Sequence, residues 1–482
     1  MGEIMDNNNK YLFDIDTLTE TELEQARVLR RKKHKQGRIL AWVVLIAVVL
    51  VLGTGLFFGA KAVIKGITGA GNKTTVSQEN GDSLADDGES DVIDDLFGDE
   101  EIVSVLPSEP DDNTPSEAEL FEESVRNYVR NMSVEEQVLG LFIVTPEQIT
   151  GVSAAIKAGD GTKKALEQYP VGGLIYSEKN MLDPKQFSDM IEGTKSMSKY
   201  PLFVAVDERL GASLFPAKMK VAATKSAAEL SAGGDANAAK EEESKIAGYL
   251  SGFGINLNLG IVADVSPAPS DGTNLPSWSF GTDTNTVAEM VVKSVQALRE
   301  NGVYSGVMFF PGQGYASSDT AQGIASNDRT REEMDACELI PFKAAADAGA
   351  TMFVVSHEAV PGLTEESVYA SQSKAVMTNI IRMDMGLDDI IIITDDLTKA
   401  AVSSYFESGE ACIASLKAGA DMLLKPEDFP KAYAEVLNAV NTGVIAHERV
   451  EDSLVRIYKV KFAGKTSDEV NSMTAEKIVS AQ

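Results

Sequence analysis

Short apolar runs that alternate with helical stretches are the feature that most restricts the fold of this 482-residue chain. Each run is short enough to be one buried strand, and the helical stretches between them are typical of parallel strand–helix units. Eight units in roughly 330 residues fit a single (β/α)8 TIM-like barrel with insertions, an α/β fold. The predicted strands are Leu139–Val144, Gly173–Tyr176, Leu202–Val206, Asn256–Val262, Gly302–Phe309, Met352–Val355, Ile390–Thr394 and Met422–Leu424.

Polar side chains directly follow four of these strands. Asp207, Asp264, His357 and Asp395 each come just after an apolar run, and a second carboxylate, Asp396, follows Asp395. The working residues of such barrels lie at the C-terminal ends of the strands, so we expect these side chains to ring one mouth. Taken singly, each is equally compatible with a strand-end polar group that is hydrogen-bonded to the backbone.

An uncharged apolar segment, Ile39–Ala60, is long enough to span a bilayer and predicts a transmembrane helix. Seven Lys and Arg residues lie between Arg27 and Arg38, whereas only Lys61 and Lys65 closely follow the segment. By the positive-inside rule, residues 1–38 are cytoplasmic and the main domain is extracellular. The sequence therefore predicts a single-pass protein of the cell membrane.

The segment after this helix is acidic, with no Lys or Arg from Thr74 to Val125. Such a composition cannot bury enough apolar surface to offset its ordering entropy, so we expect a disordered linker over residues 61–116. A helical apolar pattern begins near Glu117. The expected organisation is thus a basic tail (1–38), a membrane helix (39–60), the linker (61–116), the barrel (117–465) and a C-terminal tail (466–482).

Composition excludes several function classes. A net charge of −30 argues against nucleic acid as a partner, because phosphate binding depends on clustered Lys and Arg. Only Cys337 and Cys412 occur, which is typical of two buried free thiols, although a single bridge is compatible with the sequence. No nucleotide-binding glycine motif is present, and we expect neither a cofactor nor a metal ion.

Several short motifs occur along the chain in a fixed order and spacing. They are Met132–Gln137, Gly172–Tyr176, Pro201–Asp207, Gly254–Asn258 with Asp264-Val265, Ser279–Gly281, Phe310–Gly314, Ser356-His357, Thr394–Leu397 and Ala418–Leu424. Together these segments resemble the N-terminal domain of glycoside hydrolase family 3, in particular its β-N-acetylhexosaminidase branch. The resemblance implies a retaining glycosidase with Asp395 as the nucleophile, acting on amino-sugar glycans of the cell wall.

The chain departs from this family pattern at the general acid. In the family branch the acid is a His in a D-S-H triplet that follows a K-H-F-P-G-H-G element. Here the element reads Met308–Gly314 with Gln313 at its second His, and the triplet reads Asp319-Thr320-Ala321. No His can occupy this loop, because the only histidines of the chain are His34, His357 and His447. Asp319 remains as the remnant of the donor dyad.

Sugar-binding positions also differ from the family pattern. The resemblance implies substrate contacts at Asp207, Trp278, Met308, Phe309 and His357, but Met308-Phe309 replaces a Lys-His pair and Trp278 replaces an Arg. Apolar groups cannot supply the charge-assisted hydrogen bonds that cations give to hydroxyls. Trp278 offers instead a flat face on which a pyranose can stack. Three carboxyls are candidate substitute acids: Asp319, Glu208 and Glu358.

Two functional hypotheses follow. One is a membrane-anchored extracellular glycosidase with reduced or lost activity, which the intact Thr394–Leu397 element and Asp207 support. The alternative is a non-catalytic glycan-binding or scaffold module at the cell surface, which the changes in the donor loop support. In both, the partners are a cell-wall amino-sugar glycan and the membrane.

Overall fold

The computed structural model describes residues 115–267, 276–364 and 368–480. Its strands are β1 (Phe142–Val144), β2 (Gly173–Ile175), β3 (Phe203–Val206), β4 (Leu257–Val262), β5 (Tyr304–Phe310), β6 (Met352–Val355), β7 (Ile391–Thr394) and β8 (Leu423–Leu424). The α-helices are α2 (Glu117–Arg130), α3 (Val134–Leu139), α4 (Pro146–Thr150), α5 (Asp160–Gln168), α6 (Pro184–Met197), α7 (Ala227–Gly233), α8 (Ala236–Gly252), α9 (Thr284–Glu300), α10 (Arg331–Asp335), α11 (Leu339–Asp347), α12 (Ala400–Ser403), α13 (Ser408–Ala418), α14 (Phe429–Asn441), α15 (His447–Lys461) and α16 (Ser467–Ser480). Short helical turns are η2 (Glu178–Asn180), η3 (Ala217–Met219), η4 (Ala370–Gln372) and the π-helix η5 (Ala375–Asp384).

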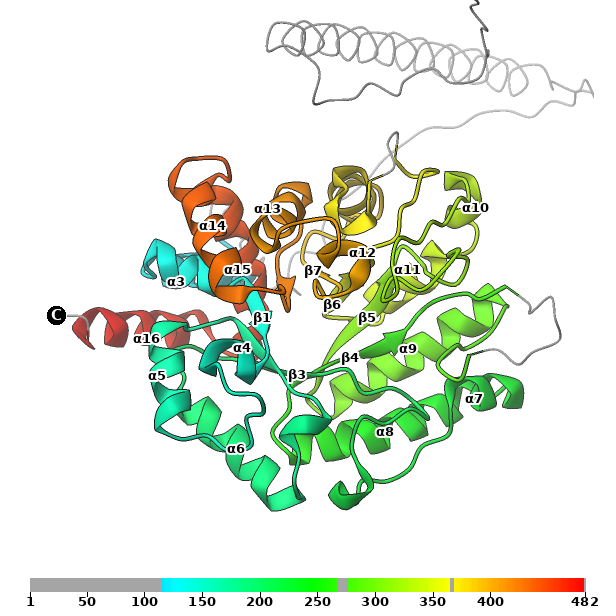
Figure 1. The fold of residues 1–482 in the computed structure, drawn as a ribbon, viewed down its shortest axis with the longest axis horizontal. Coiled ribbons are helices and arrows are strands. Elements are labelled where there is room, and N and C mark those ends of the chain that lie inside the picture. The colour runs from blue at the N-terminus through cyan, green and yellow to red at the C-terminus, as the bar shows by residue number, and fades with distance from the viewer. Residues whose placement is uncertain (1–114, 268–275, 365–367, 481–482) are drawn as a thin grey trace, which may run out of the picture. The chain divides into compact units, whose positions relative to one another are not determined.

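The eight strands are parallel and follow the order β7-β6-β5-β4-β3-β2-β1-β8. A parallel bridge between Ile393 and Met422 links the two outer strands, which nearly closes the sheet into a barrel. Figure 1 shows the strands in the middle of the domain with helices arranged around them. The structure confirms the predicted single α/β barrel of eight parallel strands.

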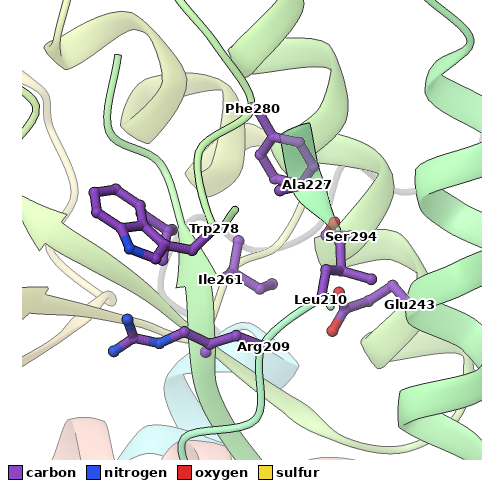
Figure 2. A pocket seen from close by; sticks show the side chains of 10 residues that line it. Arg209, Leu210, Ala227, Glu243, Ile261, Trp278, Phe280 and Ser294 are labelled. Carbon is purple, nitrogen blue, oxygen red and sulfur yellow. The ribbon is translucent and has the colours of Figure 1, made fainter. Parts of the chain in front are cut away.

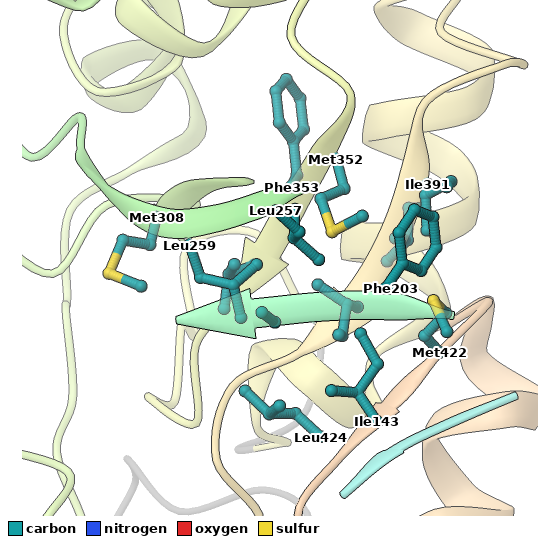
Figure 3. Close-up of a cluster of buried hydrophobic side chains, with 14 of the residues drawn as sticks. Ile143, Phe203, Leu257, Leu259, Met308, Met352, Phe353, Ile391, Met422 and Leu424 are labelled. Carbon is teal, nitrogen blue, oxygen red and sulfur yellow. The ribbon is translucent and has the colours of Figure 1, made fainter. Parts of the chain in front are cut away.

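The strand predictions agree closely with the structure because each strand is buried on both faces. Strands β3, β4, β6 and β7 contain only buried residues, as continuous apolar runs in a helix-covered parallel sheet should. The first prediction began three residues early, since Leu139 closes α3 behind the capping box of Ser133 and Glu136. Figure 3 shows side chains from several strands packed together inside the barrel.

The register of the last strands determines where the polar side chains emerge. Strands β6 and β7 pair in register from Met352–Ile391 to Val355–Thr394. The residues that follow, Ser356-His357 and Asp395-Asp396, therefore leave the sheet at the same level. This pairing places the predicted nucleophile at the C-terminal mouth of the barrel.

Terminal helices cover the outside of the barrel. Tyr128 of α2 packs against the rings of Tyr458 and Phe462, with ring centroids 5.1 and 4.9 Å away. Residues 466–482 were expected to form a tail, but they include α16, which packs against α2 and buries Val470 completely. Its sequence has few apolar residues at helical spacing, so the contact with α2 could not be read from the local pattern.

The expectations for the N-terminal segment fall outside the described residues. They are the basic tail, the transmembrane helix Ile39–Ala60 and nearly all of the acidic linker. Within the described part of the chain, no helix combines the length and the apolar character needed to cross a membrane.

Candidate active site

A cavity of about 360 Å³ opens at the C-terminal ends of the strands. Asp207, which follows β3, and Asp395, which follows β7, both line it, together with Met308 of β5. Its remaining lining residues are Thr145, Ile175, Tyr176, Ser177, Lys179, Arg209, Leu214, Leu259, Asp396, Lys399, Leu424 and Lys425. The cavity therefore occupies the place where barrel enzymes carry their active sites.

Asp395 is held rigidly at the base of this cavity. Its backbone N–H donates to the carbonyl of Val355 at 2.9 Å, and the residue is 4% exposed. Oδ1 accepts a hydrogen bond from the backbone N–H of Asp396 at 2.7 Å. Oδ2 accepts one from Nζ of Lys399 at 2.6 Å. Both oxygens of the predicted nucleophile are thus already engaged.

Asp207 is engaged in the same way. Arg209 donates from Nε to one carboxylate oxygen and from Nη2 to the other, each at 2.8 Å, which is a bidentate pair. Burial acts to lower the pKa of Arg209, but the charge and hydrogen bonds of Asp207 together with the charges of Asp395 and Asp264 outweigh it, and the pKa is raised. A carboxylate held by both oxygens has less capacity to accept from sugar hydroxyls.

The ring of Phe309 lies beneath the two cations. Nζ of Lys399 stands 4.7 Å from the ring centroid, and the guanidinium carbon of Arg209 stands 5.5 Å from it. Both distances are within the range of attractive cation–π contacts. Phe309 therefore helps to keep Lys399 and Arg209 in their present positions.

Two further predicted mouth residues are buried behind the cavity. His357 does not line it: Nε2 faces the carbonyl of Asp396 at 3.1 Å, and Nδ1 lies 2.7 Å from Oγ of Ser371. A carbonyl can only accept, so Nε2 carries the proton and Nδ1 accepts from Ser371. Burial lowers the pKa of His357, which favours this neutral ring.

Asp264 supports the segment at which the family donor loop begins. Its Oδ1 accepts hydrogen bonds from the backbone N–H groups of Gln313 at 2.9 Å and Phe309 at 3.4 Å. Burial raises the pKa of Asp264 to about 6. Asp264 is thus a positioning residue for the end of β5, and it does not line the cavity.

Neither Trp278 nor Asp319 lines the cavity around Asp395. Trp278 and Arg209 line a second, very small cavity of about 10 Å³. Figure 2 shows the indole of Trp278 and the guanidinium of Arg209 both at the left of the view. Asp319 is exposed and accepts from the backbone N–H of Ala321 at 2.8 Å. The loop that carries it docks on α12, where Ala401 N–H donates to the carbonyl of Thr320 at 3.1 Å.

The candidate substitute acids do not reach the cavity. Glu208 is buried and accepts from the hydroxyl of Tyr249 at 2.5 Å and the N–H of Leu214 at 2.9 Å. Glu358 is buried and accepts from Oγ of Ser356 at 3.1 Å, and burial raises its pKa well above the usual value. Neither of them, nor Asp319, lines the cavity that contains Asp395.

The described residues contain no group of three or more His, Cys, Asp or Glu side chains arranged to hold a metal ion. Cys337 and Cys412 are both free thiols, so the bridge that the sequence left open is not formed.

Sequence reasoning did not single out the cations of the cavity. Lys399 follows Asp395 by four residues, Arg209 follows Asp207 by two, and Lys425 pairs with Asp396 from the loop after β8. A basic residue shortly after a strand-end carboxylate is a usable signal for the first two. Lys425 is 29 positions from its partner, so only the fold brings them together.

The arrangement can bind a polar ligand, but the predicted nucleophile is already paired. No His lines the cavity, and its other two carboxylates, Asp207 and Asp396, are paired with Arg209 and Lys425. Nζ of Lys399 occupies Oδ2 of Asp395, and its positive charge offsets the negative charge of the carboxylate. A retaining glycosidase needs a free carboxylate and a second carboxyl or equivalent acid close by.

The geometry agrees with the comparisons to known proteins. Residues 134–460 match the model of the glycosyl hydrolase family 3 N terminal domain. Beta-hexosaminidase A of Pseudoalteromonas piscicida is 26% identical over 330 residues, which cover 61% of this chain and 54% of that protein. Beta-hexosaminidase LpqI of Mycobacterium tuberculosis is 32% identical over 216 residues, which cover 43% and 55%. The chain thus spans about half the length of these relatives.

Solved structures show the same fold. A glycoside hydrolase family 3 beta-N-acetylglucosaminidase from Paenibacillus sp. FPU-7 superimposes with a TM-score of 0.62 at 25% identity, covering 72% of this chain and 69% of that one. The structure of M. tuberculosis LpqI gives a TM-score of 0.61 at 26% identity, covering 70% and 96%. By its family match and its barrel, this chain belongs to glycosyl hydrolase family 3 through the N-terminal domain of that family.

Proposed function

We propose that this protein is a membrane-anchored extracellular member of family 3 that is directed at cell-wall amino-sugar glycans and whose hydrolase activity is reduced or lost. The observation that carries the proposal is the 2.6 Å ion pair between Asp395 and Lys399. Relatives named as beta-hexosaminidases and a beta-N-acetylglucosaminidase support the substrate class.

The ion pair opposes catalysis because the transition state of glycoside hydrolysis is a cation. Its positive charge develops at the sugar carbon that the nucleophile attacks. An ammonium group about 4 Å from that carbon would repel it by about 4 kcal/mol at an effective dielectric constant of 20. The family site stabilises this charge with a free carboxylate, whereas Lys399 compensates the carboxylate before substrate binds.

The missing acid adds to this effect. A positioned general acid contributes roughly 10²–10⁴-fold to the rate. Within the described residues, His357 is buried behind the cavity with both nitrogens bonded, and His447 begins α15. Substrates with poor leaving groups need such an acid most, so natural glycans should suffer most from its loss.

A second candidate is a non-catalytic glycan-binding or scaffold module. The cavity of about 360 Å³ remains open although its nucleophile is paired, which favours retained binding. A saccharide could still contact the apolar residues Leu259, Met308 and Leu424 of its lining.

Aryl N-acetyl-β-glucosaminide hydrolysis distinguishes the two candidates. A phenol of low pKa leaves without a proton donor, so a surviving nucleophile gives measurable turnover that Asp395→Asn abolishes. Asp347→Asn serves as the matched control, because Asp347 is an exposed residue of α11 that lies outside the cavity. If the wild type turns over the aryl substrate no faster than Asp395→Asn, the non-catalytic module is the function that remains. If the wild type hydrolyses alkyl glycosides rapidly, the proposal of reduced activity is contradicted.

The membrane location is supported by the apolar segment Ile39–Ala60 and the basic residues before it. Protease added to intact cells should release the barrel by cutting the acidic linker. A barrel that stays protected until the membrane is permeabilised would contradict the extracellular placement.

A further inference from the structure

Cationic side chains gather at the barrel cavity although the chain carries a net charge of −30. Four of them line it, namely Lys179, Arg209, Lys399 and Lys425, against three carboxylates, Asp207, Asp395 and Asp396. The cavity wall therefore carries slightly more positive than negative side chains, whereas the protein as a whole is strongly negative.

Hydrogen bonds already occupy the carboxylates. Arg209 engages both oxygens of Asp207, and those of Asp395 accept from Asp396 N–H and Lys399. Asp396 accepts from the backbone N–H and the hydroxyl of Thr398 through Oδ1, and from Lys425 through Oδ2. A ligand therefore meets few free acceptors on this wall.

Donors, in contrast, remain available. Arg209 uses two of its five N–H groups, and Lys399 and Lys425 each use one of three among the described residues. Nζ of Lys179 lies 3.3 Å from Oε2 of Glu147, and within the described part of the chain this oxygen accepts no hydrogen bond, so the contact is an ion pair only. The polar part of the cavity is donor-rich and acceptor-poor.

This pattern complements an anion better than a neutral sugar. Hydroxyl groups both donate and accept, whereas carboxylate and phosphate oxygens only accept and form stronger, charge-assisted hydrogen bonds with cations. Apolar side chains of Leu259, Met308 and Leu424 cover another part of the lining. Figure 3 shows these three gathered toward the arrowhead end of the strand that carries Phe203.

We propose that this cavity binds a saccharide that bears a carboxylate or a phosphate, in preference to a neutral amino sugar. The anionic group contacts Lys179, Arg209 and Lys425, and the ring packs on the apolar lining. This proposal deepens the proposed function and rests on it, since it names the ligand class of the same cavity.

Calorimetric titration of the full-length protein in detergent micelles tests this preference. The ligands are N-acetylglucosamine, its 6-phosphate, glucuronic acid and inorganic phosphate. We expect at least one anionic saccharide to bind about tenfold or more tightly than N-acetylglucosamine, with an affinity that falls as salt screens the cations. The comparison of the two anionic saccharides distinguishes phosphate from carboxylate.

Charge reversal at the cavity provides the matched variants. Lys179→Glu should weaken binding of the anionic saccharide about tenfold or more and leave that of N-acetylglucosamine nearly unchanged. Lys185→Glu is the control, because Lys185 pairs with Asp189 on the exposed face of α6. Lys425→Gln is a second test should Lys179→Glu lower the melting temperature.

The alternative outcomes separate the two proposals. Equal or tighter binding of N-acetylglucosamine overturns the anionic preference and leaves the proposed function standing. Binding of inorganic phosphate as tight as that of the sugar phosphate overturns the saccharide assignment. If none of the saccharides binds, the anionic preference and the glycan-directed function both fail.

Discussion

Nζ of Lys399 lies 2.6 Å from Oδ2 of Asp395 and 4.7 Å from the centre of the Phe309 ring. The ammonium group is therefore held between the carboxylate of the predicted nucleophile and an aromatic face. Asp395 and Lys399 are four residues apart, but Lys399 only caps the start of α12. The loop between β7 and α12 therefore sets their contact, and helical spacing does not. This family 3 barrel thus contains an internal counter-ion beside the carboxylate that the sequence analysis predicted as the nucleophile.

Removing this counter-ion should restore part of the chemistry. We expect Lys399→Met to raise kcat/KM for an aryl N-acetyl-β-glucosaminide by about 10–100-fold, because relief of roughly 1.4 kcal/mol gives each factor of ten. Methionine keeps much of the apolar length of the side chain without its charge. The control is Lys417→Met at an exposed position of α13, and the double variant with Asp395→Asn should be inactive.

A histidine in the donor loop should help only after the nucleophile is freed. While Lys399 stays paired with Asp395, Ala321→His alone should leave alkyl-glycoside hydrolysis near that of wild type. Combined with Lys399→Met, it should raise the rate for alkyl glycosides more than for aryl glycosides, because only the former need the proton. Steady-state rates on both substrates check this, and a large gain from Ala321→His by itself would contradict the role given to Lys399.

Asp421 should be a major determinant of stability. It is fully buried, and its Oδ2 accepts from Arg382 at 2.6 Å and from the N–H of Ile392 in β7 at 2.9 Å. Asp421→Asn breaks this buried pairing and should lower the free energy of unfolding by about 3–5 kcal/mol. The control Asp389→Asn removes an exposed pair with Lys459 and should cost under about 1 kcal/mol. Urea denaturation of each variant measures these differences.

The contribution of Asp421 should also depend on pH. Burial acts to raise its pKa, but Arg382, Arg456 and Arg449 outweigh burial, so the pKa in the folded state is lowered. A carboxyl with a lowered folded pKa stabilises the protein above its unfolded pKa of about 3.9 and loses this effect as the pH falls through the folded value. The stability difference between wild type and Asp421→Asn should therefore persist at pH 5–7 and shrink below about pH 4.

Glu243 should produce the opposite pH dependence. This buried residue of α8 has its pKa raised to about 8 by burial and by the nearby charge of Glu208. The folded pKa of Glu243 exceeds its unfolded value of about 4.3. Its contribution to the free energy of unfolding is therefore fully present below about pH 4.3 and is lost as the pH rises toward 8. Glu243→Gln cannot ionise, so relative to wild type it should be more stable at pH 8 than at pH 5, by a difference on the order of a few kcal/mol.

Denaturant unfolding at the two pH values measures this difference. Glu241→Gln, at an exposed position two residues earlier on α8, is the matched control and should change little between them. A constant stability difference between wild type and Glu243→Gln from pH 5 to pH 8 would show that Glu243 does not titrate in this range.

Several properties of this protein followed from its sequence alone. Eight apolar runs determined the strands, because a parallel strand covered on both faces must be apolar along its whole length. The absence of a donor histidine also needed no structure, since three histidines at known positions cannot fill the loop between Met308 and Ile324. The C-terminal mouth, with Asp207 and Asp395 beside each other at one cavity, followed from the barrel itself.

Only the tertiary structure decided how these groups are paired. Whether a strand-end carboxylate meets water, substrate or a cation depends on the path of the loops, which local sequence patterns do not specify. Lys425, which follows β8, lies beside Asp396 because β8 pairs with β1 in the barrel. His357 is hydrogen-bonded to Ser371, which lies 14 residues later in the chain. The sequence thus determined which carboxylates lie at the cavity, and the folded loops determined that Asp395 is paired with a lysine.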